Sequence, residues 1–480
     1  MTSSDSPPTA PPRILLISHD VVGDSMAGPG IRYLTLARVL ARHVPLTFAI
    51  PNAVPASLQG ESFAIHQYGR GDWASIRPLA ERHDVLVFNT DIASDFRELS
   101  ALDASLAVDG YDPMMAEWLA THAGRAPETQ LDDWRARSGQ LRAQLGMGDF
   151  FICASERQRD WWLGLLEGAG RINPRTIAAD ASLRNLIDVV PYGVDDAPRA
   201  TARRAIRGVW PGIGPTDKLI LWGGGLWNWL DPLTAIRAMA QVSRAREDVK
   251  LIFPGTRHPN PAVSGIPTHT GAARDLAEEL GLADKTVLFG DWVPYEAWSA
   301  ILLESDLALS LHFDTYETRL AFRSRVLGYI WAGLPTIATR GDATGDLIAA
   351  YGLGELVDVG DADGVADAIL RWLDVPRATL ESSFDRARTD YAWERAAGPL
   401  IRFCQNPRRA ADRAAGLVMR RHNAPPPARP ARDDDALKAA QAELAGLRAE
   451  RDRLRATVAG FERGRFIRLM RWLKTGSRGL

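Results

Sequence analysis

Short apolar runs rich in β-branched residues alternate with longer helical stretches from Arg13 onward. Six of these runs predict strands in the first part of the chain, at 13–20, 45–50, 84–89, 104–110, 149–155 and 187–193. The runs are apolar throughout rather than alternating, which is typical of parallel strands covered by helices on both faces. The pattern therefore predicts a Rossmann-like, doubly wound α/β domain over residues 13–205.

A second series of apolar runs follows a Gly/Pro-rich segment at 208–218, which reads as a hinge. Its predicted strands lie at 218–224, 249–255, 286–290, 306–312, 334–340 and 354–360. We therefore expect a second Rossmann-like domain over residues 215–405, including its closing helices. Such domains bind ligands at the carboxyl ends of their strands, so the cleft between the two is the expected site.

The composition changes after Gln405. Residues 406–435 are rich in Pro, Ala and Arg and predict an extended linker. Residues 436–475 predict a coiled coil followed by a basic amphipathic tail, because apolar residues recur at 3,4 spacing over 436–461. We expect a homo-oligomer through 436–461. The basic tail fits contact with a membrane surface, and it equally fits a solvated C-terminus.

Bulk composition narrows the class of protein. The chain has 480 residues, 46% hydrophobic and 24% charged, with a formal net charge of −2, values typical of a folded protein of two or three domains. This balance gives no global attraction to nucleic acid, and we expect no nucleic-acid partner. Cys153 and Cys404 stand in apolar contexts, which favours buried thiols in a reducing compartment. With no apolar signal segment or membrane span in the sequence, we expect a cytoplasmic location.

Candidate residues in the first domain follow the predicted strands. The loop after the first strand carries His19, Gly28 and Gly30, where glycines and a helix N-terminus suit a phosphate, although a strand-to-helix turn needs glycine for its shape as well. Asp109, Asp112 and Glu156 come at or just beyond later strand ends and are candidates for acceptor binding. Each could instead serve as a helix cap or a loop contact.

Candidate residues in the second domain form two groups. Gly223, Gly224 and Gly225 open the backbone after a strand, and Trp227 and Trp229 beside them could stack on a ring or simply pack. A later loop and helix carry Asp314 and Glu317 near three arginines. The planar guanidinium groups of these arginines match phosphate oxygens, although the arginines could instead form salt bridges on a surface helix. The basic candidates for the donor are Arg257, Arg319, Arg323 and Arg325. Asp361 and Asp363 resemble a metal motif but read as a helix cap, so we predict no metal and no cofactor.

These residues carry a resemblance to a known family. The ordered strings SDLALSLHFDTYET, VLGYIWAGLPTIAT, GDATGDLI and LVDVGDADGVADAI, with DVVPYGVD before them, resemble the donor half and domain linker of family-4 glycosyltransferases of the GT-B fold. The resemblance spans Arg13 to about Gln405. It implies transfer of a sugar from a nucleotide-sugar donor to a saccharide or lipid-linked acceptor, with retention and without metal, in cell-surface polysaccharide or glycoconjugate synthesis.

The resemblance also assigns roles to single positions. It implies contact between Glu317 and the transferred sugar, and it places Asp342 in the donor-binding loop. Gly328 stands where the family has a ribose-binding glutamate, and Gly225 stands where it has an arginine for the diphosphate. These departures leave two further readings open. One is a catalytically silent GT-B scaffold or nucleotide-binding subunit that dimerises through its coiled coil, and the other is a GT-B-like epimerase or phosphorylase.

Overall fold

The computed structural model describes residues 10–197, 199, 204–256, 268–290, 293 and 295–418, and the isolated positions 446, 450 and 453. The described residues from 10 to 418 belong to one compact unit. The predicted coiled coil, the basic tail, Arg257 and the later part of the predicted linker lie outside the residues that the structure describes. Among the described residues, no helix has the length and apolar character needed to cross a bilayer.

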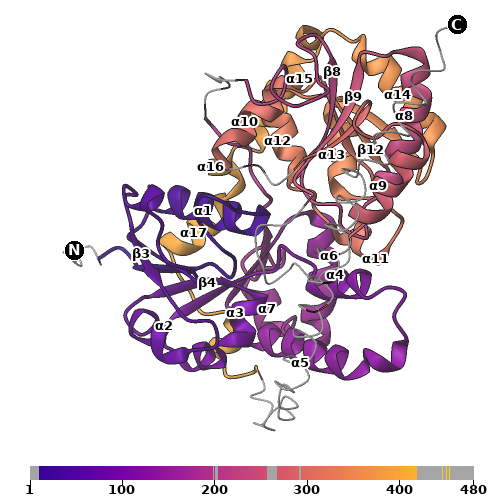
Figure 1. Ribbon diagram of the computed structural model, residues 1–480. Helices are drawn as coiled ribbons and strands as arrows, with labels where there is room; N and C mark the ends of the chain where they lie inside the picture. The colour runs from indigo at the N-terminus through magenta and orange to yellow at the C-terminus, as the bar shows by residue number, and fades with distance from the viewer. Residues whose placement is uncertain are drawn as a thin grey trace, which may run out of the picture. The chain divides into compact units, whose positions relative to one another are not determined.

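The first domain is built on a parallel seven-stranded sheet (Figure 1), in which β1 pairs with both β2 and β4. The spatial order of the strands is β3 (Ala64–Gln67), β2 (Leu46–Ile50), β1 (Ile14–Ile17), β4 (Val85–Asn89), β5 (Ser105–Asp109), β6 (Phe150–Cys153) and β7 (Ile187–Val189). All six predicted strands of this domain are present. The edge strand β3 was not predicted, because its side chains are mostly exposed and form no apolar run.

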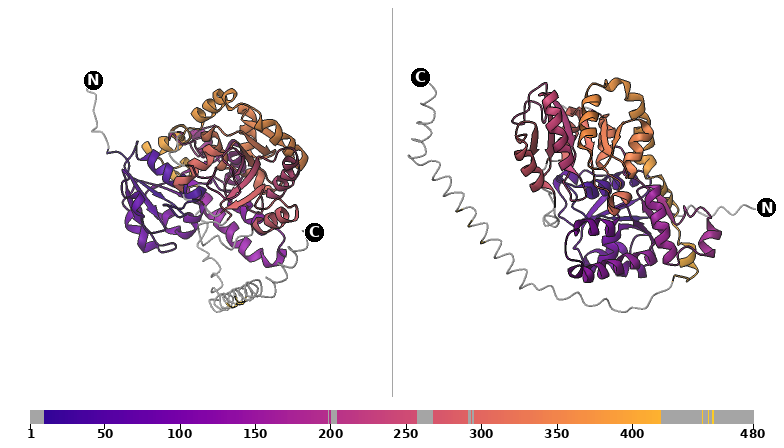
Figure 2. Two further views of the ribbon diagram at one scale, coloured as in Figure 1. Left: turned by 45° about the horizontal axis from the view of Figure 1, so that its top comes forward. Right: turned by 90° about the vertical axis from the view of Figure 1, so that its right-hand side faces the viewer.

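Helices connect these strands and cover both faces of the sheet (Figure 2), as parallel strands require. They are α1 (Gly28–Leu40), α2 (Trp73–Ala80), α3 (Thr90–Asp95), α4 (Met114–Thr121), α5 (Leu131–Met147), α6 (Glu156–Gly168) and α7 (Pro174–Ala179). Short 3₁₀ turns lie at Ala56–Leu58, Arg97–Ala101 and Pro127–Thr129. Cys153 is a free buried thiol, as is Cys404.

The second domain repeats this plan with a parallel six-stranded sheet, and all six of its predicted strands are present. The order is β10 (Val287–Gly290), β9 (Val249–Pro254), β8 (Lys218–Trp222), β11 (Leu307–Ser310), β12 (Thr336–Thr339) and β13 (Gly354–Val357). Its helices are α8 (Pro232–Ala245), α9 (Thr270–Glu279), α10 (Tyr295–Glu304), α11 (Tyr316–Leu320), α12 (Arg325–Ala332), α13 (Ala343–Tyr351), α14 (Ala362–Leu373) and α15 (Glu381–Asp390), with a 3₁₀ turn at Arg377–Thr379. Asp361 caps α14 by accepting a hydrogen bond from the Gly364 N–H.

The chain then returns to the first domain. In Figure 1 the yellow-orange α17 (Gly398–Gln405) lies beside α1. With α16 (Trp393–Ala396), it adds Trp393, Leu400 and Phe403 to the core around β1 and β2. Their order in the sequence predicts that these closing helices belong to the second domain. Their apolar pattern shows that each helix buries one face but does not show which sheet receives that face.

The described part of the predicted linker is also attached to the first domain. Helix α18 (Ala411–Ala414) places Asp412, which is fully buried, against the Arg171 guanidinium, and Arg413 pairs with buried Asp149. Residues 406–416 therefore differ from the extended linker that their composition suggested. The reason is that buried ion pairs between distant segments leave no local signal in the sequence.

Candidate functional site

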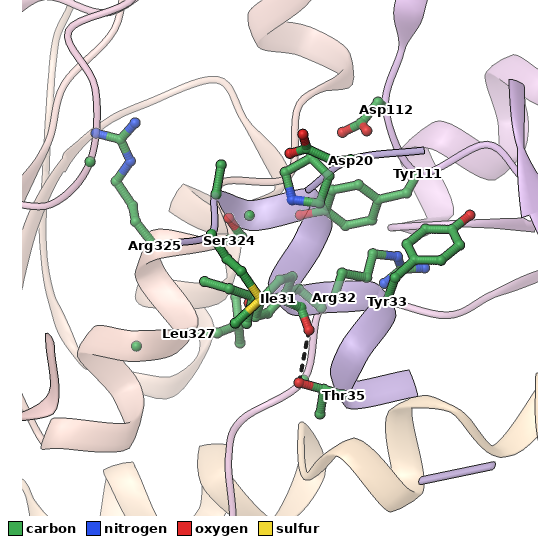
Figure 3. A pocket seen from close by; sticks show the side chains of 18 of the residues that line it. Asp20, Ile31, Arg32, Tyr33, Thr35, Tyr111, Asp112, Ser324, Arg325 and Leu327 are labelled. Carbon is green, nitrogen blue, oxygen red and sulfur yellow. Dashed lines mark hydrogen bonds between the residues drawn. The ribbon is translucent and has the colours of Figure 1, made fainter. Parts of the chain in front are cut away.

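A cavity of about 970 Å³ lies between the two domains, at the carboxyl ends of both sheets. The first domain contributes the loops after β1, β4 and β5 and the first turns of α1. The second domain contributes the loop after β8 and parts of α10 and α12. Figure 3 shows side chains from both domains around this space. The cavity is therefore at the position expected for a pair of Rossmann-like domains.

The glycine loop after β8 forms one wall of the cavity, as predicted for Gly223, Gly224 and Gly225. The Gly223 N–H donates a 2.8 Å hydrogen bond to the Tyr329 hydroxyl, and a Cβ at Gly223 would lie 2.6 Å from the same oxygen. Gly224 has a φ of +86°, a conformation that favours glycine. The glycine loop can pass α12 only because its residues carry no side chains. Its backbone is therefore open toward the cavity.

Arg325 supplies positive charge beside this loop. Its Nη1 is buried and has no hydrogen-bond partner among the described residues, and its guanidinium lies 5.9 Å from the Trp222 ring centroid. Burial lowers the pKa of Arg325 to about 10, so the side chain remains charged at neutral pH. In Figure 3 it lies on the opposite side of the drawn cavity from Asp112. A partly buried cation whose buried nitrogen has no hydrogen-bond partner is costly, and an anionic ligand would offset that cost.

The other predicted arginine and carboxylate partners lie apart from the cavity. Glu317 is 1% exposed, and both of its oxygens accept hydrogen bonds from Arg323, at 2.6 and 2.8 Å. The Arg323 Nε lies 3.4 Å from Asp342, whose other partner in this buried group is His312 at 3.6 Å. Of the described residues that line the cavity, none belongs to this group.

Glu317, Arg323 and Asp342, which the sequence predicts as site residues, do not line the cavity in this arrangement. The Glu317 carboxylate is occupied by Arg323 rather than facing a bound sugar, and Asp342 caps α13 by accepting the Gly345 N–H at 2.6 Å. Arg319 does not line the cavity either, and its side chain is 69% exposed and lies 3.6 Å from Asp314. Segment 314–325 thus holds one arginine that faces the cavity and two that do not.

In the first domain, His19, Gly28, Asp109 and Asp112 line the cavity as predicted. Burial raises the pKa of Asp112 to about 6, opposed by the nearby His19. Asp109 is held by the buried Arg32 through 2.9 and 3.3 Å hydrogen bonds. This wall of the cavity is therefore acidic and rich in hydrogen-bonding groups, in contrast to the wall formed by the second domain.

Two predicted residues of the first domain do not line the cavity. A Cβ on Gly30 would lie 2.3 Å from the Val21 carbonyl oxygen, so this glycine serves the close approach of α1 to the preceding loop. Glu156 is exposed at the start of α6 and accepts a hydrogen bond from Arg184 at 2.8 Å. Gly30 and Glu156 therefore have structural roles in a tight turn and a surface contact, which the sequence left open as alternatives.

Several cavity residues were not predicted. They include Arg32, Tyr111, Glu117, Trp298 and Ser324. Burial, followed by the charges of Asp112 and Glu317, raises the pKa of Glu117 well above its usual range. Most of these residues lie within helices rather than directly after strands, so the strand-end rule used on the sequence does not find them.

Two tryptophans whose role was left open also line the cavity. Trp227 and Trp229 lie with ring centroids 5.6 Å apart and planes within 12° of parallel. Gly328 lines the cavity too, and a Cβ there would meet only Leu302, at 3.5 Å or more. The space next to Arg325 is therefore bounded by aromatic and aliphatic groups, with room at position 328.

The fold and the interdomain cavity together define the class: this is an α/β protein of the two-domain GT-B fold. No protein-family model and no curated protein matches the sequence. Solved structures do match it. WaaG, a glycosyltransferase involved in lipopolysaccharide biosynthesis, is similar at 18% identity with a TM-score of 0.53, over 84% of this chain and 100% of that one.

Two further structures are similar over nearly their whole length. HepE from Anabaena, in complex with UDP and glucose, has 13% identity and a TM-score of 0.58, covering 82% of this chain and 100% of its own. Sucrose-phosphate synthase from Thermosynechococcus elongatus has 16% identity and a TM-score of 0.55, covering 82% and 98%. At these identities the comparison establishes the shared fold.

Proposed function

We propose that this protein is a glycosyltransferase that moves a sugar from a nucleotide-sugar donor to a saccharide or lipid-linked acceptor. The observation that carries the proposal is Arg325, a partly buried cation whose Nη1 has no hydrogen-bond partner in the described part of the chain, beside the open backbone of Gly224 and Gly225 in the interdomain cavity. The fold shared with WaaG and HepE supports it, and HepE was solved with UDP and glucose.

The chemistry follows from where charge develops. When the bond between sugar and diphosphate breaks, negative charge builds on the leaving diphosphate, and fixed positive charge lowers that barrier most where water is excluded. Arg325 stands where it can provide this charge with a planar fork that matches phosphate oxygens. It takes the place of the basic residue that the family resemblance put at Gly225.

The wall of the first domain would receive the acceptor. Asp112 and His19 present hydrogen-bonding groups that suit a polyhydroxylated acceptor, whereas both oxygens of Asp109 already accept hydrogen bonds from Arg32. We propose transfer with retention, in which the acceptor hydroxyl attacks from the face that the diphosphate leaves and a phosphate oxygen takes its proton. No protein base is assigned, and no bound metal is invoked.

The biological setting is part of the same proposal. We propose a cytoplasmic enzyme of cell-surface polysaccharide or glycoconjugate synthesis, a homo-oligomer through residues 436–461, with its basic tail at the inner face of the membrane. The involvement of WaaG in lipopolysaccharide biosynthesis is in keeping with this setting. The sequence pattern of residues 436–480 supports the assembly and membrane parts.

The test is turnover by the purified full chain with UDP-, GDP- and dTDP-sugars, following release of the nucleoside diphosphate with and without added saccharide acceptors. We expect release with at least one donor and loss of release in Arg325→Ala. Binding of a donor without release from any of them would instead favour the silent nucleotide-binding subunit. Absence of both binding and release would contradict the proposal.

A further inference from the structure

The segment that carries Arg325 is held by the opposite domain. Residues 321–324 connect α11 to α12 without regular structure, and Arg325 is the first residue of α12. Hydrogen bonds from the first domain reach the backbone carbonyls of Leu320 and Phe322, immediately before and within this connection. The side chain proposed to bind the donor therefore stands on a segment whose path is fixed from across the cleft.

Gln158 makes the first of these contacts. It lies in α6, is fully buried, and its Nε2 donates to the Leu320 carbonyl at 2.7 Å and to the Tyr111 carbonyl at 2.8 Å. Its Oε1 accepts the Ala154 N–H at 2.7 Å. All the hydrogen-bonding groups of this amide are thus used, and they join α6, the loop after β5 and the end of α11 at one point.

Tyr111 makes the second contact. Its hydroxyl donates to the Phe322 carbonyl at 2.9 Å, and its ring meets the Phe322 ring edge to face at 6.4 Å. The Arg32 guanidinium lies over the other part of the ring, 4.4 Å from its centroid. Tyr111 belongs to the same short loop as Asp109 and Asp112, so the loop proposed to receive the acceptor also holds the donor segment.

We propose that Tyr111 and Gln158 are positioning residues that set the place of Arg325, and that they couple the acceptor loop to donor binding. This inference rests on the proposed function of Arg325. Neither residue is assigned contact with the diphosphate. Each acts by fixing a backbone carbonyl of the segment that leads into Arg325, because a guanidinium displaced by about 1 Å loses much of its alignment with phosphate oxygens.

The decisive variant is Tyr111→Phe, which removes one hydroxyl and keeps the ring between Arg32 and Phe322. The chain offers a matched control in Tyr316→Phe. The Tyr316 hydroxyl accepts a 2.7 Å hydrogen bond from Trp161, which also joins the two domains, but its residue is 49% exposed and lies on α11, away from the turn into Arg325. Both variants delete one hydroxyl that joins the two domains.

The measurement is the Kd of the full chain for UDP, GDP and dTDP without acceptor. The Kd of the nucleotide that binds most tightly is then measured for every variant. We expect Tyr111→Phe to weaken binding about five- to tenfold, the equivalent of one lost positioning bond, while Tyr316→Phe leaves Kd unchanged. In the Arg325→Ala background, Tyr111→Phe should have little further effect, because the two residues act on one contact. Gln158→Leu should weaken nucleotide binding as Tyr111→Phe does. Urea unfolding measures how far this substitution also lowers the free energy of unfolding.

The outcomes separate the two proposals. If Arg325→Ala weakens nucleotide binding but Tyr111→Phe does not, or if Tyr111→Phe remains fully effective without Arg325, the positioning role is refuted and the donor site stands. If Arg325→Ala leaves binding unchanged, or none of the three nucleotides binds, the donor site itself fails and the positioning role fails with it. If Tyr316→Phe weakens nucleotide binding as much as Tyr111→Phe, the effect comes from a general loosening of the contact between the domains. That result would also refute the specific positioning role of Tyr111.

Discussion

Replacing Arg325 by alanine is the perturbation that bears most heavily on the proposed site. The guanidinium has a buried Nη1 with no hydrogen-bond partner among the residues that the structure describes, and burial already lowers its pKa to about 10. Removing the guanidinium therefore breaks no ion pair or hydrogen bond within that part of the chain, and we expect the free energy of unfolding to stay within about 1 kcal/mol of the parent value. A loss of function in this variant can then be assigned to the lost contact with ligand.

The size of that loss follows from the kind of bond involved. A charge-assisted hydrogen bond to phosphate contributes about 1.5–3 kcal/mol, so Arg325→Ala should weaken nucleoside diphosphate binding roughly 10- to 150-fold. Arg325→Lys keeps the charge but not the planar guanidinium, so its affinity for nucleoside diphosphate should lie between those of the parent and Arg325→Ala. Arg319→Ala is the matched control, because it removes an exposed arginine six residues away in the chain and should bind as the parent does.

The assay is calorimetric titration with UDP, GDP and dTDP, alongside urea unfolding of each variant. Binding by Arg325→Ala within about twofold of the parent, with an intact fold, would refute the reasoning. So would an equal loss in Arg319→Ala, because that would indicate a response to net charge rather than to a specific contact.

Three further predictions concern the buried groups and the C-terminal arm. Glu317→Gln removes the carboxylate that accepts both hydrogen bonds from Arg323 and leaves only Asp342 nearby, at 3.4 Å, so the free energy of unfolding should fall by about 1.5–3 kcal/mol in urea titrations, and an unchanged value would contradict the buried pair. The pKa of Asp112 is raised from its usual 3.8 to about 6, so the folded state holds its proton more tightly and stability should fall as pH rises from 4 to 6. Asp112→Asn should flatten the dependence of the free energy of unfolding on pH over this range, and an unaltered slope would contradict the raised pKa of Asp112. Deletion of residues 436–480 should convert the protein to a monomer in light scattering while nucleotide binding is retained, and an unaltered mass would rule out the coiled-coil assembly.

Much of the fold could be predicted from local pattern. Continuous apolar runs identify twelve strands, most of which are buried on both faces, because burial of both sides removes the polar alternation. Strand β3 has the burial of an edge strand and carries no such signal. The closing helices α16 and α17 show the same limit, since their periodicity predicts a buried face but not the sheet on which it lies.

The candidate site was only partly predictable for a related reason. Glycine loops report on the backbone next to them, so Gly223, Gly224 and Gly28 were found. The sequence could not separate Arg325 from Arg323, two residues away, because the break between α11 and α12 turns one toward the cavity and the other toward Glu317. Pairing of that kind is decided by tertiary contacts, as is the placement of Tyr111 and Gln158 across the cleft.

The central claim is sugar transfer from a nucleotide donor held by Arg325. Its most direct test is nucleoside diphosphate release by the parent protein and by Arg325→Ala, across UDP-, GDP- and dTDP-sugars with a panel of saccharide acceptors. The account predicts release from at least one donor by the parent and at least a tenfold slower release by the variant at a donor concentration below KM. Release at equal rates by the two proteins, or no release from any donor by the parent, would contradict it.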